Sequence, residues 1–181
     1  VIRNVISVNA GNGRVESRPQ NVGDATTSGL ELEAKFRLDQ LLTDAPRVDL
    51  RWNGSIYDSK VKSVPGPNNR LESQARGSVN LGADYRWRGT PLSVGGNLNW
   101  TPSATTRISE TQVFRESAKL VGDAYALWVF DPNLQLRLTA SNFAPRDYQT
   151  TNRVEGFGLA QTTTNADKGR MNLNVRLEVK L

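Results

Sequence analysis

The chain contains no cysteine and no histidine among its 181 residues. Without cysteine it forms no disulfide bond and performs no thiol chemistry. The absence does not indicate whether the protein lies in a reducing or an oxidising compartment. Without histidine it lacks the side chain that most often serves as a general base or a metal ligand. Both absences remove common catalytic and metal-binding groups, and we expect no enzyme activity, no catalytic residue, no metal site and no cofactor.

Long hydrophobic runs are also missing. The longest continuous apolar run is Ala124–Phe130, far short of the ~20 residues that a membrane-spanning helix needs. Transmembrane helices are therefore excluded. A mean hydropathy of -0.51 is typical of a soluble protein. It does not exclude a membrane β-barrel, because only every second residue of such a barrel's strands faces lipid.

The formal net charge of +5 comes without any block of lysines or arginines. Scattered single charges are typical of solvated or lumen-facing positions, whereas nucleic-acid binders cluster their basic residues on one face. We therefore expect no nucleic-acid partner. The sequence begins at Val1 without an initiator methionine or a signal-peptide pattern, so either a signal has been removed or the chain is a piece of something longer.

Alternation of apolar and polar residues is the strongest pattern in the sequence. It is clearest in Leu134–Ala140 and Met171–Leu181, and it is typical of strands with one apolar face. Asp131-Pro132-Asn133 predicts a tight turn just before the first of them. The pattern predicts about eight strands, the others lying near residues 1–8, 29–38, 47–62, 72–87, 92–101 and 114–130.

The connections between these strands also follow a pattern. Long connections are predicted over 14–28, near residue 67, over 102–112 and over 142–167, and they alternate with short turns near residues 42, 89 and 132. Phe36, Tyr85 and Trp87 fall near short turns and Trp100 near the opposite edge, which fits two aromatic girdles. Outer-membrane barrels have this arrangement. The sequence thus predicts an all-β, antiparallel transmembrane β-barrel with its C-terminus at the short-turn end.

Several segments resemble those of TonB-dependent outer-membrane receptors. They are Asn21–Ala25 (NVGDA) with Ser28–Ala34 (SGLELEA), Tyr57–Val61 (YDSKV), Ser78–Tyr85 (SVNLGADY), Leu98–Pro102 (LNWTP) and Leu136–Tyr148 (LRLTASNFAPRDY). Their order and spacing resemble those of the family over nearly the whole chain. The sequence departs from the family pattern at Leu181, where the family normally ends in Phe or Trp.

The resemblance implies that residues 1–181 are the last part of a barrel of about 22 strands. An N-terminal plug domain, absent from this chain, would lie inside that barrel. The resemblance also implies a place in the bacterial outer membrane, among its lipid and lipopolysaccharide. The implied function is the import of a ferric siderophore or a similar scarce small-molecule nutrient, with energy delivered by the TonB complex through the plug.

Contacts with such a nutrient are expected from polar-face residues near the long loops. Alternation places five of them toward the lumen: Tyr57, Arg76, Asn97, Asn99 and Thr101. Glu31 and Glu33 also share a face, but Lys35 and Arg37 continue it. The pattern therefore favours a neutralised lumen wall over an acid/base pair.

Two other architectures fit the same alternation. Eight strands can close into a self-contained membrane barrel filled by its own side chains. A soluble ligand-binding barrel of the lipocalin type also has eight strands. Upstream sequence with a plug and more strands would favour the receptor, whereas a purified chain that stays monomeric without detergent would favour the soluble barrel.

Overall fold

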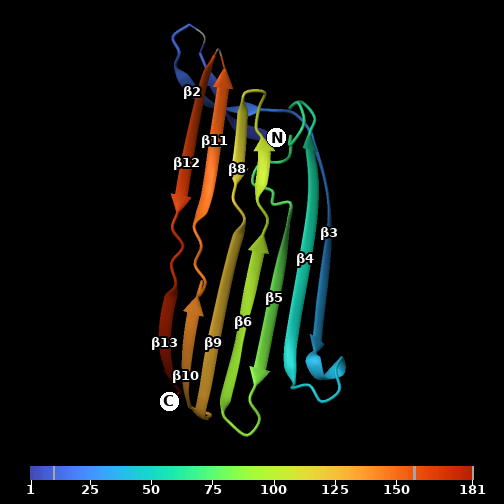
Figure 1. Ribbon diagram of the computed structural model, residues 1–181, viewed down its shortest axis with the longest axis vertical. Coiled ribbons are helices and arrows are strands. Elements are labelled where there is room, and N and C mark those ends of the chain that lie inside the picture. The colour runs from blue at the N-terminus through green and yellow to red at the C-terminus, as the bar shows by residue number, and fades with distance from the viewer. Residues whose placement is uncertain (10, 157, 181) are drawn as a thin grey trace.

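The computed structural model describes residues 1–9, 11–156 and 158–180, and antiparallel β-strands dominate it. Figure 1 shows an elongated molecule whose longest strands run along its long axis. The all-β antiparallel fold expected from the sequence is confirmed. The elements are β1 (Ile2–Val8), β2 (Val15–Asn21), β3 (Ala25–Arg37), the 3₁₀ turn η1 (Leu38–Gln40), β4 (Val48–Val61), β5 (Gly77–Arg86), β6 (Leu92–Thr101), β7 (Ala104–Arg107), β8 (Gln112–Glu116), β9 (Lys119–Asp131), β10 (Leu134–Ser141), β11 (Tyr148–Gly156), β12 (Leu159–Asp167) and β13 (Asn172–Val179).

Seven of these strands form one sheet, here called the wall sheet. Its order is β13-β10-β9-β6-β5-β4-β3, and each neighbouring pair is antiparallel. The predicted strands at 29–38, 47–62, 92–101 and 134–140 all lie in it. Within the described part of the chain, β3 and β13 each pair with one neighbour, so the sheet is open at both edges.

The short and long connections lie at opposite ends of the wall sheet, as predicted. The turns between β3 and β4, between β5 and β6 and between β9 and β10 gather at the lower end of Figure 1, together with the C-terminus. The long connections gather at the other end. Leu181, which the sequence predicts as the end of the last strand, lies outside the described residues.

The prediction that residues 1–8 form the first strand of the main sheet is wrong. These residues do form a strand, β1, but β1 pairs with β2 in a separate two-stranded sheet. The prediction of a loop over residues 14–28 is also wrong, because this segment contains β2 and the start of β3. Pairing across a short turn costs little loop entropy, so β1 takes its nearest neighbour in sequence as its partner.

The long connections are also more regular than predicted. β7, β8, β11 and β12 form a second sheet, here called the loop sheet, in the order β12-β11-β8-β7. It includes parts of the segments 102–112 and 142–167, which were predicted to be loops. The single strand predicted over 114–130 is divided into β8 and β9 at Ser117 and Ala118. β12 has threonine on both of its exposed faces, so its residues give no apolar alternation to detect.

The most buried side chains lie at the loop end of the molecule, where Val61 at the end of β4 is one of them, and not in the middle of the wall sheet. Apolar residues less than a tenth exposed there are Val5, Val61, Val64, Ala104, Ile108 and Val154. No helix among the described residues has both the length and the apolar character to cross a membrane.

Arg3 ties three segments together in this buried region. Its side chain is almost wholly buried. Nη1 donates to the carbonyl oxygens of Arg107 and Ile108, each at 3.0 Å, and Nη2 donates to the carbonyl of Arg70. One guanidinium thus joins the β1–β2 hairpin to the β4–β5 connection and to the β7–β8 connection.

We expect Arg3→Met to loosen these connections while leaving the wall sheet intact, because the variant keeps the apolar stem but removes the donors to three carbonyls. A buried polar group left without its partner costs about 1–3 kcal/mol. Native-state hydrogen exchange of residues 62–76 and 107–112 measures the effect. Arg18→Met is the matched control, since the Arg18 side chain on β2 is largely exposed. Equal exchange in the two variants would refute the role of Arg3.

Candidate functional site

The wall sheet has one polar face and one apolar face, because its strands share a register that keeps their alternation in step. Two adjacent rows of paired residues show this. A polar row crosses the sheet through Asn174, Thr139, Tyr125, Gly95, Asp84, Asp49 and Arg37. The next row is apolar and consists of Val175, Leu138, Ala126, Val94, Tyr85 and Val48.

A charged cluster occupies the middle of the polar face. The Tyr125 hydroxyl on β9 donates to Asp84 Oδ1 on β5 at 2.6 Å, and Arg51 on β4 forms an ion pair with the same carboxylate. The Arg137 guanidinium on β10 lies 5.0 Å from the centroid of the Tyr125 ring, a favourable cation–π arrangement. Side chains from four strands are thus joined around one carboxylate.

Gly95 makes the contact between Tyr125 and Asp84 possible. It lies on β6, between the strands that carry these two residues. A Cβ atom at Gly95 would lie 2.2 Å from Asp84 Oδ1 and 2.6 Å from the Tyr125 ring, closer than atoms can approach. Any side chain at this position would therefore separate the hydroxyl from the carboxylate.

A row of three asparagines lies nearer the loop end of the same face. Asn53, Asn80 and Asn99 pair across β4, β5 and β6. Asn80 Nδ2 donates to Asn53 Oδ1 at 2.5 Å, and Asn99 Nδ2 donates to Asn80 Oδ1. Amides offer both donors and acceptors, so this row is suited to hydrogen-bonding a polar solute.

The five predicted ligand contacts fall into two groups. Asn97, Asn99 and Thr101 lie on the polar face of β6, where Asn97 Nδ2 donates to Asp123 Oδ2 at 3.4 Å and Thr101 pairs with Lys119. Tyr57 and Arg76 lie together nearer the loops, because the Tyr57 amide donates to the Arg76 carbonyl at 2.9 Å. Their roles as ligand contacts stay predictions.

The second group is tied to its neighbours by side-chain contacts. The Tyr57 hydroxyl donates to the Glu31 carboxylate on β3, and its ring lies across Gly29, where an added Cβ would be 2.4 Å from the ring. The Arg76 guanidinium donates to Asn68 Oδ1 at 3.0 Å. Glu33 instead pairs with Lys35 at 2.7 Å. Glu33 therefore pairs with a cation, as expected for a neutralised wall, whereas Glu31 accepts from the neutral Tyr57 hydroxyl.

Two polar depressions accompany these residues. One of about 210 Å³ is lined by Asn97, Asp123, Tyr125, Arg137 and other polar-face residues of β4, β5, β6, β9 and β10. Another of about 630 Å³ lies near the short turns and includes Arg37, Arg47, Arg86 and Arg88. Within the described residues, no three acidic side chains gather as a metal site would require. The polar face is suited to binding polar solutes or a polar protein surface.

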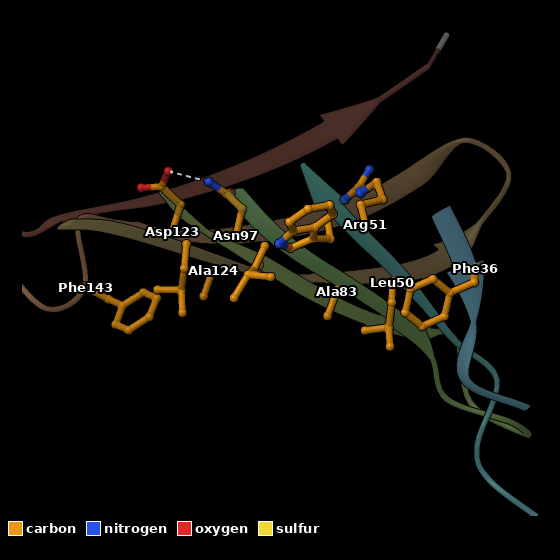
Figure 2. Close-up of a pocket in the computed structure, with 13 residues that line it drawn as sticks. Phe36, Leu50, Arg51, Ala83, Asn97, Asp123, Ala124 and Phe143 are labelled. Carbon is orange, nitrogen blue, oxygen red and sulfur yellow. Dashed lines mark hydrogen bonds between the residues drawn. The ribbon is translucent and has the colours of Figure 1, made fainter. Parts of the chain in front are cut away.

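The apolar face carries a groove of about 500 Å³. Figure 2 shows Phe36, Leu50 and Phe143 on one side of the ribbon and Arg51 and Asn97 on the other. The floor of the groove includes three small residues, Ala83, Gly96 and Ala124. This groove therefore belongs to the face opposite the charged cluster.

Sequence reasoning missed the cluster around Asp84. Alternation places Arg51 and Asp84 on polar faces, but it leaves the faces of β9 unassigned, because Val121, Tyr125 and Leu127 share the polar face with Asp123. The contact partners of Asp84 depend on the register of four strands. The glycine at position 95, within an otherwise regular strand, was the one local signal of a close approach.

A comparison with protein families gives one match. The family model described as "TonB dependent receptor-like, beta-barrel" matches residues 1–143. No curated protein and no solved structure matches the chain.

We expect Tyr125→Phe to destabilise the wall sheet by about 1 kcal/mol, because it removes one hydrogen bond to a carboxylate that keeps its pairing with Arg51. Urea unfolding of the detergent-solubilised protein measures the change. Tyr85→Phe is the control, since Tyr85 lies in the neighbouring apolar row. An equal midpoint for the two variants would contradict a stabilising role for the Tyr125 hydroxyl.

Proposed function

We propose, because this chain belongs to the TonB-dependent receptor-like β-barrel family, that it forms the C-terminal barrel segment of an outer-membrane receptor that imports a scarce nutrient. The family is one of outer-membrane receptors rather than of enzymes. The proposed cargo is a ferric siderophore or a similar small molecule. The proposed source of energy is the TonB complex, acting through a plug domain that these residues do not contain.

The outward apolar face carries this proposal. Leu173, Val175 and Leu177 on β13 are 67%, 70% and 60% exposed, and they alternate with Asn174 and Arg176 on the polar face. A row of large apolar side chains this exposed is unfavourable in water. In a bilayer the same row contacts acyl chains, while the polar face lines an aqueous lumen.

Aromatic residues at the two ends of the apolar face support the same orientation. Trp87, Trp128 and Phe130 lie near the short turns, and Trp100 lies near the loop end of β6; all four are at least 40% exposed. Outer-membrane barrels place aromatic girdles at both membrane interfaces. The short turns would then face the periplasm and the loop sheet the cell exterior.

The open edges of the wall sheet favour a larger barrel over a closed barrel of eight strands. A membrane-embedded edge would leave backbone donors and acceptors unpaired in hydrocarbon. In the described residues β3 and β13 do not pair with each other. A lipocalin-type soluble barrel needs the same closure and also an apolar interior. We therefore propose that residues 1–181 complete a barrel whose remaining strands come from elsewhere in the protein.

On this proposal, the polar face receives the solute after the loops capture it. Tyr57 and Arg76 at the loop end, and Asn97, Asn99 and Thr101 on β6, are the proposed contacts. Asn99 is itself part of the amide row, and the cluster around Asp84 lies further along the same face, toward the short turns.

A charge on the apolar face tests the orientation of the sheet. Val175→Arg should block assembly into the outer membrane, since arginine on the lipid face near the midplane costs about 2–4 kcal/mol. Asn174→Arg, one residue away on the polar face, should assemble normally. Heat-modifiable mobility of the receptor in outer-membrane fractions measures folding. Assembly of both variants to the same level would overturn the proposed lipid-facing side.

Growth on single nutrient sources tests the import function. A strain that lacks the receptor gene should fail to grow on one ferric siderophore or vitamin that supports the parent strain. Complementation should restore growth only while the TonB complex is intact. Growth restored equally without TonB would refute energised import.

A further inference from the structure

The loop sheet carries three arginines on one face. Arg107 on β7 and Arg153 on β11 both lie opposite Val113 of β8, and Arg115 is two residues further along β8. With strands ~4.8 Å apart and ~3.4 Å per residue, the three Cα atoms are roughly 8–10 Å from one another. Long guanidinium side chains at that spacing can reach one shared group.

These arginines line a depression of about 360 Å³. Its other lining residues are Val113, three threonines and two glutamates: Thr111, Thr151, Thr162, Glu110 and Glu155. With three arginines and two glutamates, the lining has a formal charge of 3 − 2 = +1. The threonine hydroxyls add donors around the cationic groups.

The positive charge of this depression is incompletely neutralised by the protein. Arg153 pairs with Glu155, whereas Arg107 donates from Nη1 to the neutral carbonyl of Glu110 at 3.2 Å. Among the ion pairs found in residues 1–9, 11–156 and 158–180, none includes Arg107 or Arg115. Like charges on neighbouring strands repel, and an anion bound between them would remove that repulsion.

The arginines lie on the continuation of the proposed lumen face. Thr101 pairs with Lys119, and Ala104 pairs with Glu116, so the ladders of β6–β9 and β7–β8 share one register. Arg107 and Arg115 therefore follow in phase from Asn97, Asn99 and Thr101.

The opposite face of the loop sheet is already covered. Ile108, Gln112 and Val154 on that face are buried, and the Ile6 amide of β1 donates to Gln112 Oε1 at 2.9 Å. The β1–β2 hairpin thus packs against the side away from the arginines. Only the arginine face is left for a solute that enters the lumen.

We infer that Arg107, Arg115 and Arg153 form an oxyanion-binding subsite for the imported solute, which therefore bears a carboxylate or phosphate group. Guanidinium forks bind such groups through two parallel hydrogen bonds. The assignment of the ligand to the imported solute rests on the proposed function; the binding of an oxyanion rests on the geometry of the site alone.

The test uses the full-length receptor in non-ionic detergent, titrated calorimetrically with citrate and, separately, with inorganic phosphate at low ionic strength. Arg115→Gln should weaken binding of the tighter probe at least about tenfold. Arg115→Lys should have an intermediate effect, because it keeps the charge and loses the fork. Arg176→Gln is the control, since Arg176 on the polar face of β13 pairs with Glu178. No binding of either probe, or equal affinities for Arg115→Gln and Arg176→Gln, would overturn the inference.

Lipopolysaccharide phosphate is the other source of the same chemistry. Binding of the probes should persist in lipopolysaccharide-free protein, and added lipopolysaccharide should not compete with them. Competition that depends on Arg115 would assign the site to the lipid and overturn the inference. Uptake separates this result from the proposed function: import without TonB refutes the function alone, whereas TonB-dependent import unaffected by Arg115→Gln refutes the subsite alone.

Discussion

A single register across the wall sheet is the constraint on which the other features depend. Because strand side chains alternate with a period of two, a slip of one residue would exchange the two faces of a strand. The β9–β10 hairpin shows how this is avoided. Asp131 Oδ1 accepts the Asn133 amide at 2.7 Å within the turn, and the pairing shifts by one residue between Leu134 and Gln135. The shift pairs Leu136 with Trp128 and Arg137 with Leu127, so the tryptophan stays on the apolar face.

The polar cluster is a consequence of that register. Asp84, Gly95 and Tyr125 lie opposite one another on three consecutive strands, and only this alignment puts a residue without a side chain beneath the tyrosine. Tyr57 crosses Gly29 in the same way to reach Glu31. In both places a glycine on the polar face allows an aromatic ring to reach a carboxylate beyond its own cross-strand partner. Hydrogen bonds between side chains thereby join neighbouring strands across the polar face.

Sequence alone predicts the strands whose two faces differ in polarity, and it fails where they do not. β4, β6, β10 and β13 have apolar residues at every second position, and their predicted ranges agree with the structure to within a few residues. β2 and β12 are polar on both sides, because both of their faces are exposed, so alternation gives no signal. Parity placed Asn97, Asn99 and Thr101 on one face correctly, but the partners of Asp84 and the arginine group depend on pairings between strands far apart in sequence.

The two ends of the molecule are stabilised by different interactions. The wall sheet is held by its ladder hydrogen bonds, and its apolar side chains are largely exposed. The loop end has its own small core around Val61 and Ile108 and the buried Arg3 guanidinium. The side chains of Arg107, Arg115 and Arg153 lie on the face of the loop sheet opposite the buried Gln112 and Val154. Substitutions of these three side chains are therefore expected to leave the packing of Val61 and Ile108 unchanged.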